Sequence, residues 1–396
     1  METKTIQRRY DLDWLRVLAI LGIFIFHCTR FFDTDDWAIK NQTTYMFVNI
    51  WKQYTNIWGM PLILIISGAS VFYALGKFSP GKYIKGIVLR LFVPLVVGMF
   101  THIAFQVYLE RLHKGEFSGS FFEFYPHYFD GMYAFGGNFA WMGLHLWYLE
   151  ILLILSLLFL PLFLFFKKNG VGRHLLKTLG DVLAFPGGVL LFVLPVLLLL
   201  GNLDEATWGN RDMGGWSVVI YPCFFIAGFV IVSHERLQAH IQRIRWLYLG
   251  LGMLSAAAYL FFEFQLRYPQ FYSLGEKLVD PLLSLSVWCW LLAVFGFGMK
   301  RLNFSSPLLK YANEAVLPFY ILHQSMIVTL GYFVVQWAIP GLLKFLFILS
   351  VSFLISMGLY EFLVRRFDLL RFLFGMKPPV KAAAAQPQES QVIEPA

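Results

Sequence analysis

The chain has 396 residues, of which 58% are hydrophobic and 14% charged, and its formal net charge is +8. Soluble globular domains carry about 25% charged residues. This chain has too few ionic side chains to cover a water-facing surface, so the composition excludes a soluble fold. The positive charge does not indicate nucleic-acid binding, because Lys and Arg gather beside apolar segments. We expect an all-α, polytopic membrane protein.

About ten apolar segments are long enough to cross the hydrocarbon core of a membrane, which takes about 20 residues each. In the fifth segment, Pro186-Gly187-Gly188 and Pro195 are expected to bend or interrupt the helix. A bundle of about ten transmembrane helices is therefore predicted at residues 12–31, 54–75, 84–108, 144–166, 181–201, 216–233, 246–265, 279–299, 315–337 and 342–364.

The Lys and Arg residues assign the two sides of the membrane, because they resist translocation. If the N-terminus is cytoplasmic, the cytoplasmic segments are rich in these residues and the opposite segments hold fewer in total. Both termini are thus predicted to be cytoplasmic. The first apolar segment is long and no small-residue cleavage site follows it, so it should stay as a helix. We expect one transmembrane domain over residues 1–376 and a disordered cytoplasmic tail over residues 377–396.

The first apolar segment carries polar residues that are unfavourable in contact with lipid. Arg16 and His27 are separated by ten residues. At about 100° per residue they share one helix face and lie roughly 16 Å apart along the axis. Asp13 and Arg30 lie near the same face. This polar stripe predicts a cavity lined by protein; the alternative is a purely structural pairing of Arg16 with His27.

Further polar residues in the apolar segments form two groups by depth. The inner group offers guanidinium groups, which suit phosphates, and comprises Asp13, Arg16, Arg90, Asn313, Glu314 and Glu361. The outer group offers imidazoles, which exchange protons near neutral pH, and comprises His27, Arg30, His102, His145, Glu150, Glu263 and Asp280, with His323 nearer the middle. A cytosolic phosphorylated donor and an outer hydroxyl acceptor would account for both groups. A structural role near the membrane interface is an equal alternative for His145, Glu150 and Asp280.

Three other features of the sequence bear on the kind of site that this protein contains. The predicted extracytoplasmic connection at residues 109–143 is long and rich in aromatic side chains, which either stack on sugars or pack at the membrane surface. The three cysteines, Cys28, Cys223 and Cys289, fall in apolar segments, and their odd number gives no disulfide framework. The histidines lack local metal-ligand spacing, so no metal site is predicted.

Four short motifs of this chain are Tyr10-Asp11-Leu12-Asp13-Trp14-Leu15-Arg16 followed by His27, Arg90-Leu91-Phe92-Val93-Pro94, His145-Leu146-Trp147-Tyr148, and Pro318-Phe319-Tyr320-Ile321-Leu322-His323-Gln324. Together they resemble one family of integral membrane enzymes, the acyltransferase-3 family. The last two look most like its branch of the glucan biosynthesis protein C type, which includes succinyltransferases acting on periplasmic glucans. The resemblance covers nearly the whole chain and departs from the family at Ile87, where a second Arg often precedes the equivalent of Arg90.

The resemblance implies that the enzyme transfers an acyl group, acetyl or succinyl, from a coenzyme A thioester to a hydroxyl of an extracytoplasmic carbohydrate. It also implies that His27 is the catalytic histidine and that Arg16 and Arg90 serve the donor. Acyl-CoA would be a co-substrate, and no tightly bound cofactor is expected. The expected partners are this donor, a glycan acceptor and membrane lipid, without nucleic acid. We expect a multi-pass protein of the bacterial inner membrane.

A sugar hydroxyl is a poor nucleophile, and we expect neutral His27 to act as its general base, with His323 as a second base or as an orienting residue. The acyl group would cross the membrane as an acyl-His27 intermediate or on the pantetheine arm. The helical angle of Cys28, about 100° from the stripe, disfavours it as an acyl carrier. A transporter of a glycan or small polar substrate is the alternative function, and a scaffold without chemistry is a third. The expected site residues are His27, Arg16 and His323 for catalysis, Arg16, Arg90 and Lys85 for the donor, and His145, Glu150, Asp280, Tyr320 and Trp147 for the acceptor.

Overall fold

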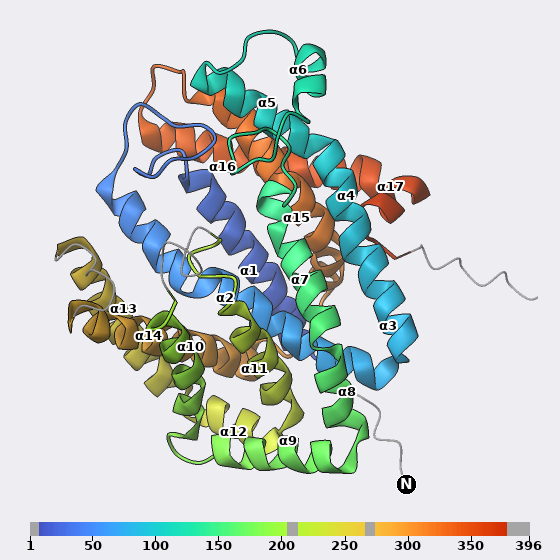
Figure 1. Cartoon of the computed structure of the whole chain (residues 1–396), viewed down its shortest axis with the longest axis vertical. Helices are drawn as coiled ribbons and strands as arrows, with labels where there is room; N and C mark the ends of the chain where they lie inside the picture. The colour runs from blue at the N-terminus through green and yellow to red at the C-terminus, as the bar shows by residue number, and fades with distance from the viewer. Residues whose placement is uncertain (1–7, 204–212, 266–273, 378–396) are drawn as a thin grey trace, which may run out of the picture.

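The computed structural model describes residues 8–203, 213–265 and 274–377 (Figure 1). Helices make up most of this part of the chain, and its only strand-like feature is an isolated bridge between Met132 and Phe139. The prediction of an all-α fold is confirmed. The tail predicted at residues 377–396 lies, apart from Lys377, outside the described residues.

Within the described residues, seven helical segments are long and apolar enough to cross a membrane. Each overlaps a predicted span. A helix is suited to cross lipid because it hydrogen-bonds its own backbone and needs no partner there. They are α1 (Tyr10–Thr29), α2 (Met46–Lys77), the run of α3 (Pro80–Ile87), η1 (Val88–Phe92), α4 (Val93–Phe100) and α5 (His102–Lys114), α13 (Arg245–Gln265), α14 (Leu274–Arg301), α15 (Pro307–Val334), and α16 (Gly341–Leu359) with η4 (Tyr360–Val364).

The other predicted spans are bent or short. The segment at residues 144–166 consists of η2 (Leu144–Leu146), α7 (Trp147–Leu158) and α8 (Leu160–Lys168), with a bend of 45° between α7 and α8. A bend of 115° separates α9 (Gly170–Leu183) from η3 (Gly188–Phe192) and α10 (Val193–Leu200). The span predicted at 216–233 is the shorter helix α11 (Tyr221–Ser233).

The sharp bend falls where Pro186-Gly187-Gly188 predicts an interruption. Gly187 has φ of +80°, a backbone conformation that favours glycine. A Cβ atom on Gly188 would lie 2.2 Å from the carbonyl oxygen of Val182. Both glycines are therefore required by the turn.

The remaining helices are short: α6 (Phe121–His127), α12 (Glu235–Arg243) and α17 (Asp368–Leu373). The connection predicted at 109–143 is more ordered than expected, because α5 continues to Lys114 and α6 forms within it. A capping box starts α6: the Ser120 backbone N–H donates to Glu123 Oε2 at 2.6 Å, and the Glu123 N–H donates to Ser120 Oγ at 3.3 Å.

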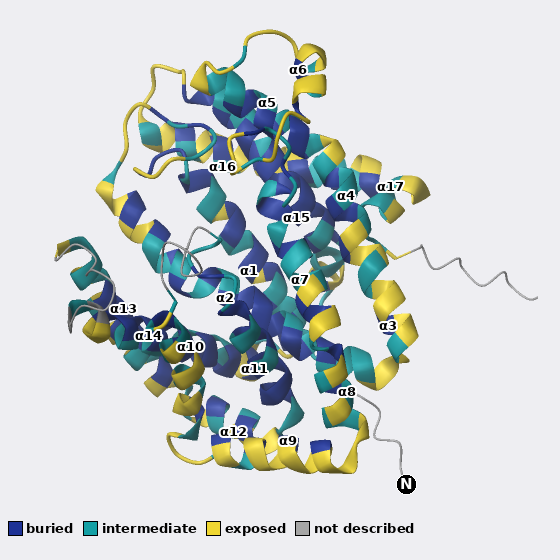
Figure 2. Cartoon of the chain, viewed as in Figure 1, coloured by how far each residue is buried: buried dark blue, intermediate teal, exposed yellow. Residues whose placement is uncertain are grey.

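Two glycines bring α2 and α11 into backbone contact. A Cβ atom on Gly68 would lie 1.8 Å from the carbonyl oxygen of Phe225, and one on Gly228 would lie 1.9 Å from that of Ile65. Small residues of this kind permit close packing of membrane helices. Figure 2 shows that buried residues gather along α1, α11 and α15, whereas α3 and α9 expose much of their surface.

The three cysteines are free thiols. Cys28 and Cys289 are 0% exposed, and Cys223 is half-buried. None of them is among the residues that line the two large cavities described next. Their placement is that of small apolar side chains in the helix packing.

Candidate active site

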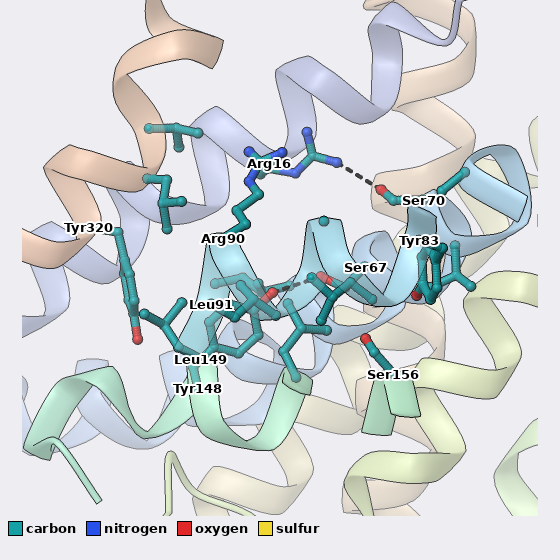
Figure 3. A pocket seen from close by; sticks show the side chains of 18 of the residues that line it. Arg16, Ser67, Ser70, Tyr83, Arg90, Leu91, Tyr148, Leu149, Ser156 and Tyr320 are labelled. Atoms are coloured by element: carbon teal, nitrogen blue, oxygen red, sulfur yellow. Dashed lines mark hydrogen bonds between the residues drawn. The ribbon is translucent and has the colours of Figure 1, made fainter. Parts of the chain in front are cut away.

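The first large cavity lies between α1, α2, α3, η1, α7 and α15 and has a volume of about 490 Å³. We call it the arginine cavity, because Arg16 and Arg90 lie close together on its wall (Figure 3). The described residues that line it include no carboxylate, and its charged members are Arg16, Lys82, Arg90 and Lys377. Such a lining suits an anionic ligand.

Arg16 is held by partners on three helices. Its Nη1 donates to Asp13 Oδ1 at 3.2 Å and to Asn313 Oδ1 at 3.3 Å, and its Nη2 donates to Ser70 Oγ at 2.8 Å (Figure 3). Asp13 is shared, because it also forms an ion pair with Arg8 at 2.9 Å. Because these hydrogen bonds already hold the planar guanidinium of Arg16 in place, a ligand that binds in the cavity does not have to order this side chain.

Arg90 lies in η1, a π-helical turn that interrupts the helix from Pro80. Pro94 follows four residues later and has no N–H to donate to the Arg90 carbonyl, which accounts for the local irregularity. Within the described residues, Arg90 forms no ion pair. The Arg90–Pro94 motif therefore places on the cavity wall a cation that forms no ion pair with a described residue.

The second large cavity has a volume of about 670 Å³, and we call it the histidine cavity because it is lined by His27 and His145. It differs in character from the arginine cavity, since it combines aromatic side chains with charges of both signs. The aromatic residues are Phe26, Trp37, Tyr133, Trp141 and Trp147, and the charged residues are Arg30, Asp35, Asp36, Lys52 and Glu110.

Ion pairs neutralise much of the charge in the histidine cavity. The buried ammonium of Lys52 donates to Asp35, and Arg30 Nη1 donates to Asp33 at 2.5 Å. Burial alone would raise the pKa of Asp35, but the hydrogen bond and charge of Lys52 and the nearby cations hold that pKa below its usual value. Asp35 is therefore ionised at neutral pH and balances Lys52.

Imidazoles from four helical segments form a cluster at the histidine cavity. The ring centroids of His27 and His323 are 5.4 Å apart, those of His145 and His323 are 5.3 Å apart, and those of His102 and His145 are 6.2 Å apart. The fold thus brings together the predicted residues His27, His145 and His323. Of these, His27 and His145 line the cavity and His323 lies behind them, fully buried.

Backbone carbonyls fix the tautomers of two imidazoles, because a carbonyl only accepts hydrogen bonds. His323 Nδ1 donates to the Tyr320 carbonyl at 2.6 Å, and His145 Nε2 donates to the Ile321 carbonyl at 3.1 Å. The opposite ring nitrogens, His323 Nε2 and His145 Nδ1, are buried without a hydrogen-bond partner among the described residues, as is His27 Nδ1. These nitrogens are available for proton transfer.

A chain of polar side chains continues from His102. His102 Nδ1 and Ser325 Oγ are 2.8 Å apart, Gln106 Nε2 donates to Ser325 Oγ at 2.7 Å, and Gln324 Nε2 donates to Gln106 Oε1 at 3.3 Å. Gln106 and Gln324 both line the histidine cavity. The histidine cluster is therefore supported from behind by a hydrogen-bonded network.

The two cavities approach each other to within about one helical turn. On α1, Ile20 lines the arginine cavity and Ile23 lines the histidine cavity; on α2, the corresponding residues are Ile63 and Met60. Three residues of helix rise about 4.5 Å. The cavity predicted along the polar stripe of α1 is thus divided in two, with Arg16 on one side of a thin partition and His27 on the other.

Tyr320 spans this partition. Its ring lines the arginine cavity, and its hydroxyl donates a hydrogen bond to the backbone carbonyl of His145, which lines the histidine cavity. Beside it, Tyr148 hydrogen-bonds Ser67 Oγ at 2.7 Å (Figure 3). Tyr320, predicted as an acceptor residue, therefore lies on the arginine-cavity side.

Other predicted residues lie elsewhere. Trp147 lines the histidine cavity. Glu150 is half-buried on α7 and Asp280 is buried on α14, and neither lines either cavity. Lys85 is exposed on α3 and does not line the arginine cavity, whereas Lys82 does.

Some site residues were not predicted from the sequence. Gln106 follows His102 by four residues, so a search of the same helix face would have found it. Gln324 directly follows His323 and was quoted only as part of a motif. Lys377 lies beyond the last apolar segment, and no local signal marks it.

The sequence comparison decides the family. A sequence model of the acyltransferase-3 family, described as an acyltransferase domain, matches residues 9–361. The chain belongs to this family. It is therefore an acyl-transferring enzyme, and its apolar helices make it a multi-pass membrane protein.

Two similar relatives of this acyltransferase are bacterial proteins called glucans biosynthesis protein C. The one from Salmonella paratyphi B is 24% identical and the one from Salmonella heidelberg is 25% identical. Each alignment covers 94% of this chain and 96% of the relative. No solved structure matches the chain.

Proposed function

We propose that this acyltransferase moves an acetyl or succinyl group from a cytoplasmic coenzyme A thioester to a hydroxyl of an extracytoplasmic carbohydrate. The observation that carries the proposal is the pair of cavities of opposite character that approach within one helical turn. A donor with several phosphates suits the arginine cavity. A polyhydroxylated acceptor suits the histidine cavity.

The donor assignment is supported by charge and shape. Guanidinium groups bind phosphates through paired hydrogen bonds, and Arg16 and Arg90 lie on a wall without carboxylates among its described residues. Toward the partition the lining becomes apolar, with Ile20, Ile63 and Leu149. This gradient suits coenzyme A, whose phosphates lie at one end and whose uncharged pantetheine arm lies at the other.

The acceptor assignment is supported by the aromatic lining of the histidine cavity. Trp37, Trp141 and Trp147 offer flat apolar faces, and an indole combines such a face with an N–H donor. Sugar rings carry apolar C–H faces rimmed by hydroxyls, so they match this combination. The relatives' printed name refers to glucans, which supports a glycan acceptor for this chain as well.

In the proposed reaction His27 is the general base. Its neutral imidazole takes the proton of the acceptor hydroxyl while the oxygen attacks the thioester carbonyl carbon. The C–S bond then breaks, and the imidazolium returns the proton to the departing thiolate. A positioned histidine base accelerates such reactions by about 10²–10⁴-fold. His323, whose Nε2 has no hydrogen-bond partner among the described residues and whose ring lies 5.4 Å from that of His27, stabilises the imidazolium and so positions His27.

The proposed orientation puts the arginine cavity on the cytoplasmic side, where the Lys-rich connections are expected, and the histidine cavity on the extracytoplasmic side of the bacterial inner membrane. The acyl group then has to cross only the partition at Tyr320. The acyl group can cross either as an acyl-His27 intermediate or on the pantetheine arm. Direct transfer, with the pantetheine arm in the partition, requires the shorter path.

The test uses the full-length protein in membrane vesicles with acetyl-CoA or succinyl-CoA and an added glucan. Wild type should acylate the glucan, and the His27→Gln variant should lose about 10²–10⁴-fold in kcat, because the base is removed. His127→Gln is the matched control, since His127 is exposed on α6 and lines neither cavity.

Equal acylation by wild type and His27→Gln would refute the role of His27. Acylation of no glycan with either donor would refute the proposed substrates. A covalent acyl-histidine, detected by mass spectrometry after exposure to donor alone, would replace direct transfer by a two-step path.

A further inference from the structure

The end of the described chain returns to the arginine cavity. After η4, residues 365–377 turn through α17, and Lys377 joins Arg16, Lys82 and Arg90 in the cavity lining. The family match stops at residue 361, so this contribution comes from outside the matched region. It raises the question of whether the segment is part of the donor site.

Arg371 ties this segment to α15. Its Nη1 and Nη2 both donate to Glu314 Oε1 at 3.2 Å, and its side chain is 11% exposed. The same guanidinium holds two backbone carbonyls, those of Arg365 at 3.1 Å and Lys377 at 3.0 Å. Arg371 therefore fixes the backbone of Lys377 directly.

Gly375 brings the segment against η1. It has φ of +66°, and a Cβ atom here would lie 2.4 Å from the carbonyl oxygen of Arg90 and 2.9 Å from Cγ of Pro94. The contact is thus open only to glycine. Gly375 therefore packs against the backbone of Arg90, and Lys377 follows this contact by two residues in the sequence.

Cations crowd around Lys377. Partial desolvation of Lys377, which is itself an exposed residue, and then the charges of Arg90, Lys77 and Arg8 lower its pKa, in that order of effect. Neighbouring positive charges repel one another, and no carboxylate is found among the lining residues that the structure describes. Such a cluster is relieved by a polyanion. Ile87, one turn before Arg90, adds only an apolar side chain to the same wall.

We propose that residues 368–377 complete the donor site and that Lys377 binds a phosphate group of the coenzyme A thioester, with Arg371 and Gly375 as positioning residues. The identity of the anion rests on the proposed function. Lys377 and the segment 368–377 then determine donor affinity and do not take part in the chemistry at His27.

The experiment measures binding of free coenzyme A and of pantetheine, which lacks the phosphates, to the full-length protein in detergent by calorimetry. Lys377→Ala should weaken coenzyme A binding about 10- to 100-fold, the range expected for one charge-assisted hydrogen bond, and leave pantetheine binding unchanged. Lys377→Arg should restore binding of coenzyme A. Lys177→Ala is the matched control, because Lys177 is an exposed lysine of α9 outside the cavity lining.

Arg371→Ala should also weaken coenzyme A binding selectively. The Arg371→Ala, Lys377→Ala double variant should lose no more affinity than the more strongly affected single variant, because both residues act through one contact. Unchanged coenzyme A affinity in Lys377→Ala overturns the inference, as does an equal loss of coenzyme A and pantetheine, which would indicate a general role in cavity shape. If wild type binds coenzyme A but acylates no glycan, the inference stands and the proposed function fails. If wild type binds no coenzyme A, both fail.

Discussion

The hydroxyl of Tyr320 donates a hydrogen bond to the backbone carbonyl of His145, and these two residues line different cavities. Together with the hydrogen bond from His145 Nε2 to the Ile321 carbonyl, this contact joins α15 to η2 at the partition. In the proposed function, this partition separates a thioester in the arginine cavity from water and acceptor in the histidine cavity. Separation of this kind suppresses hydrolysis of a reactive donor.

Removing the Tyr320 ring should join the two cavities. In Tyr320→Ala we expect acyl-CoA hydrolysis without acceptor to rise relative to glucan acylation, about tenfold if the barrier to water falls by about 1.4 kcal/mol. Release of coenzyme A, with and without glucan, measures the ratio. Tyr320→Phe is the control: it keeps the ring and should lose only about 1–2 kcal/mol of stability with the hydrogen bond. A ratio that stays at the wild-type value in Tyr320→Ala argues against the partition.

His323 should affect turnover and not donor affinity. It lies behind His27 at 5.4 Å between ring centroids and is fully buried. His323→Asn should lower kcat about 10- to 100-fold, equivalent to about 1.5–3 kcal/mol from one hydrogen bond to a charged group. The KM for acyl-CoA should change little. Initial-rate kinetics distinguish the two constants, and a raised KM at unchanged kcat would contradict the assignment.

The close contact of α2 and α11 should tolerate no side chain. Gly228→Ala places a methyl group where the Ile65 carbonyl oxygen lies, and the helices must separate at a loss of about 1–3 kcal/mol. We expect a lower melting temperature in detergent. Gly250→Ala is the control, because nothing lies within 4 Å of its added Cβ on α13, so it should be neutral or gain up to about 1 kcal/mol from helix propensity. Equal melting temperatures of the two variants would disprove the packing argument.

The ion pair of Asp35 with Lys52 should give a pH-dependent contribution to stability. Lys52 is 6% exposed and Asp35 51% exposed, so Asp35→Asn should cost about 1–2 kcal/mol rather than the value for a fully buried pair. Because the folded pKa of Asp35 is lowered, this contribution is complete above the ordinary carboxyl value of 3.8 and is lost as pH falls through the lower folded pKa.

Melting curves from pH 8 down to pH 3 measure this contribution. The difference between wild type and Asp35→Asn should be constant near neutral pH and shrink only in the acidic range. Asp36→Asn serves as control, because Asp36 is 84% exposed and meets Lys114 only at 3.4 Å. A difference that disappears already near pH 6 would show that another group is responsible.

Much of the fold could be predicted from the sequence because lipid leaves a chain few choices. A polar residue in an apolar segment has to face protein, and this argument alone placed Arg16 and His27 on cavity walls. The break at Gly187 followed from residue types that cannot continue a helix. These inferences depend only on local chemistry.

Depth along a helix did not give the direction of a side chain relative to its neighbours. Glu150 and Asp280 lie in the predicted outer group but face neither cavity, because the helix packing determines which face points inward. The same limit explains why Lys82, and not the predicted Lys85, lines the wall of the arginine cavity. Lys377 is brought to the site by Arg371 and Gly375, contacts between segments far apart in the sequence.

The complete burial of Cys28 and Cys289 makes membrane sidedness measurable. A membrane-impermeant maleimide cannot reach these thiols, so a background with Cys223→Ser should remain unlabelled. In the proposed orientation, a single reporter thiol at Phe135→Cys, a position 74% exposed, should react in spheroplasts, and one at Phe304→Cys, 49% exposed, only after lysis.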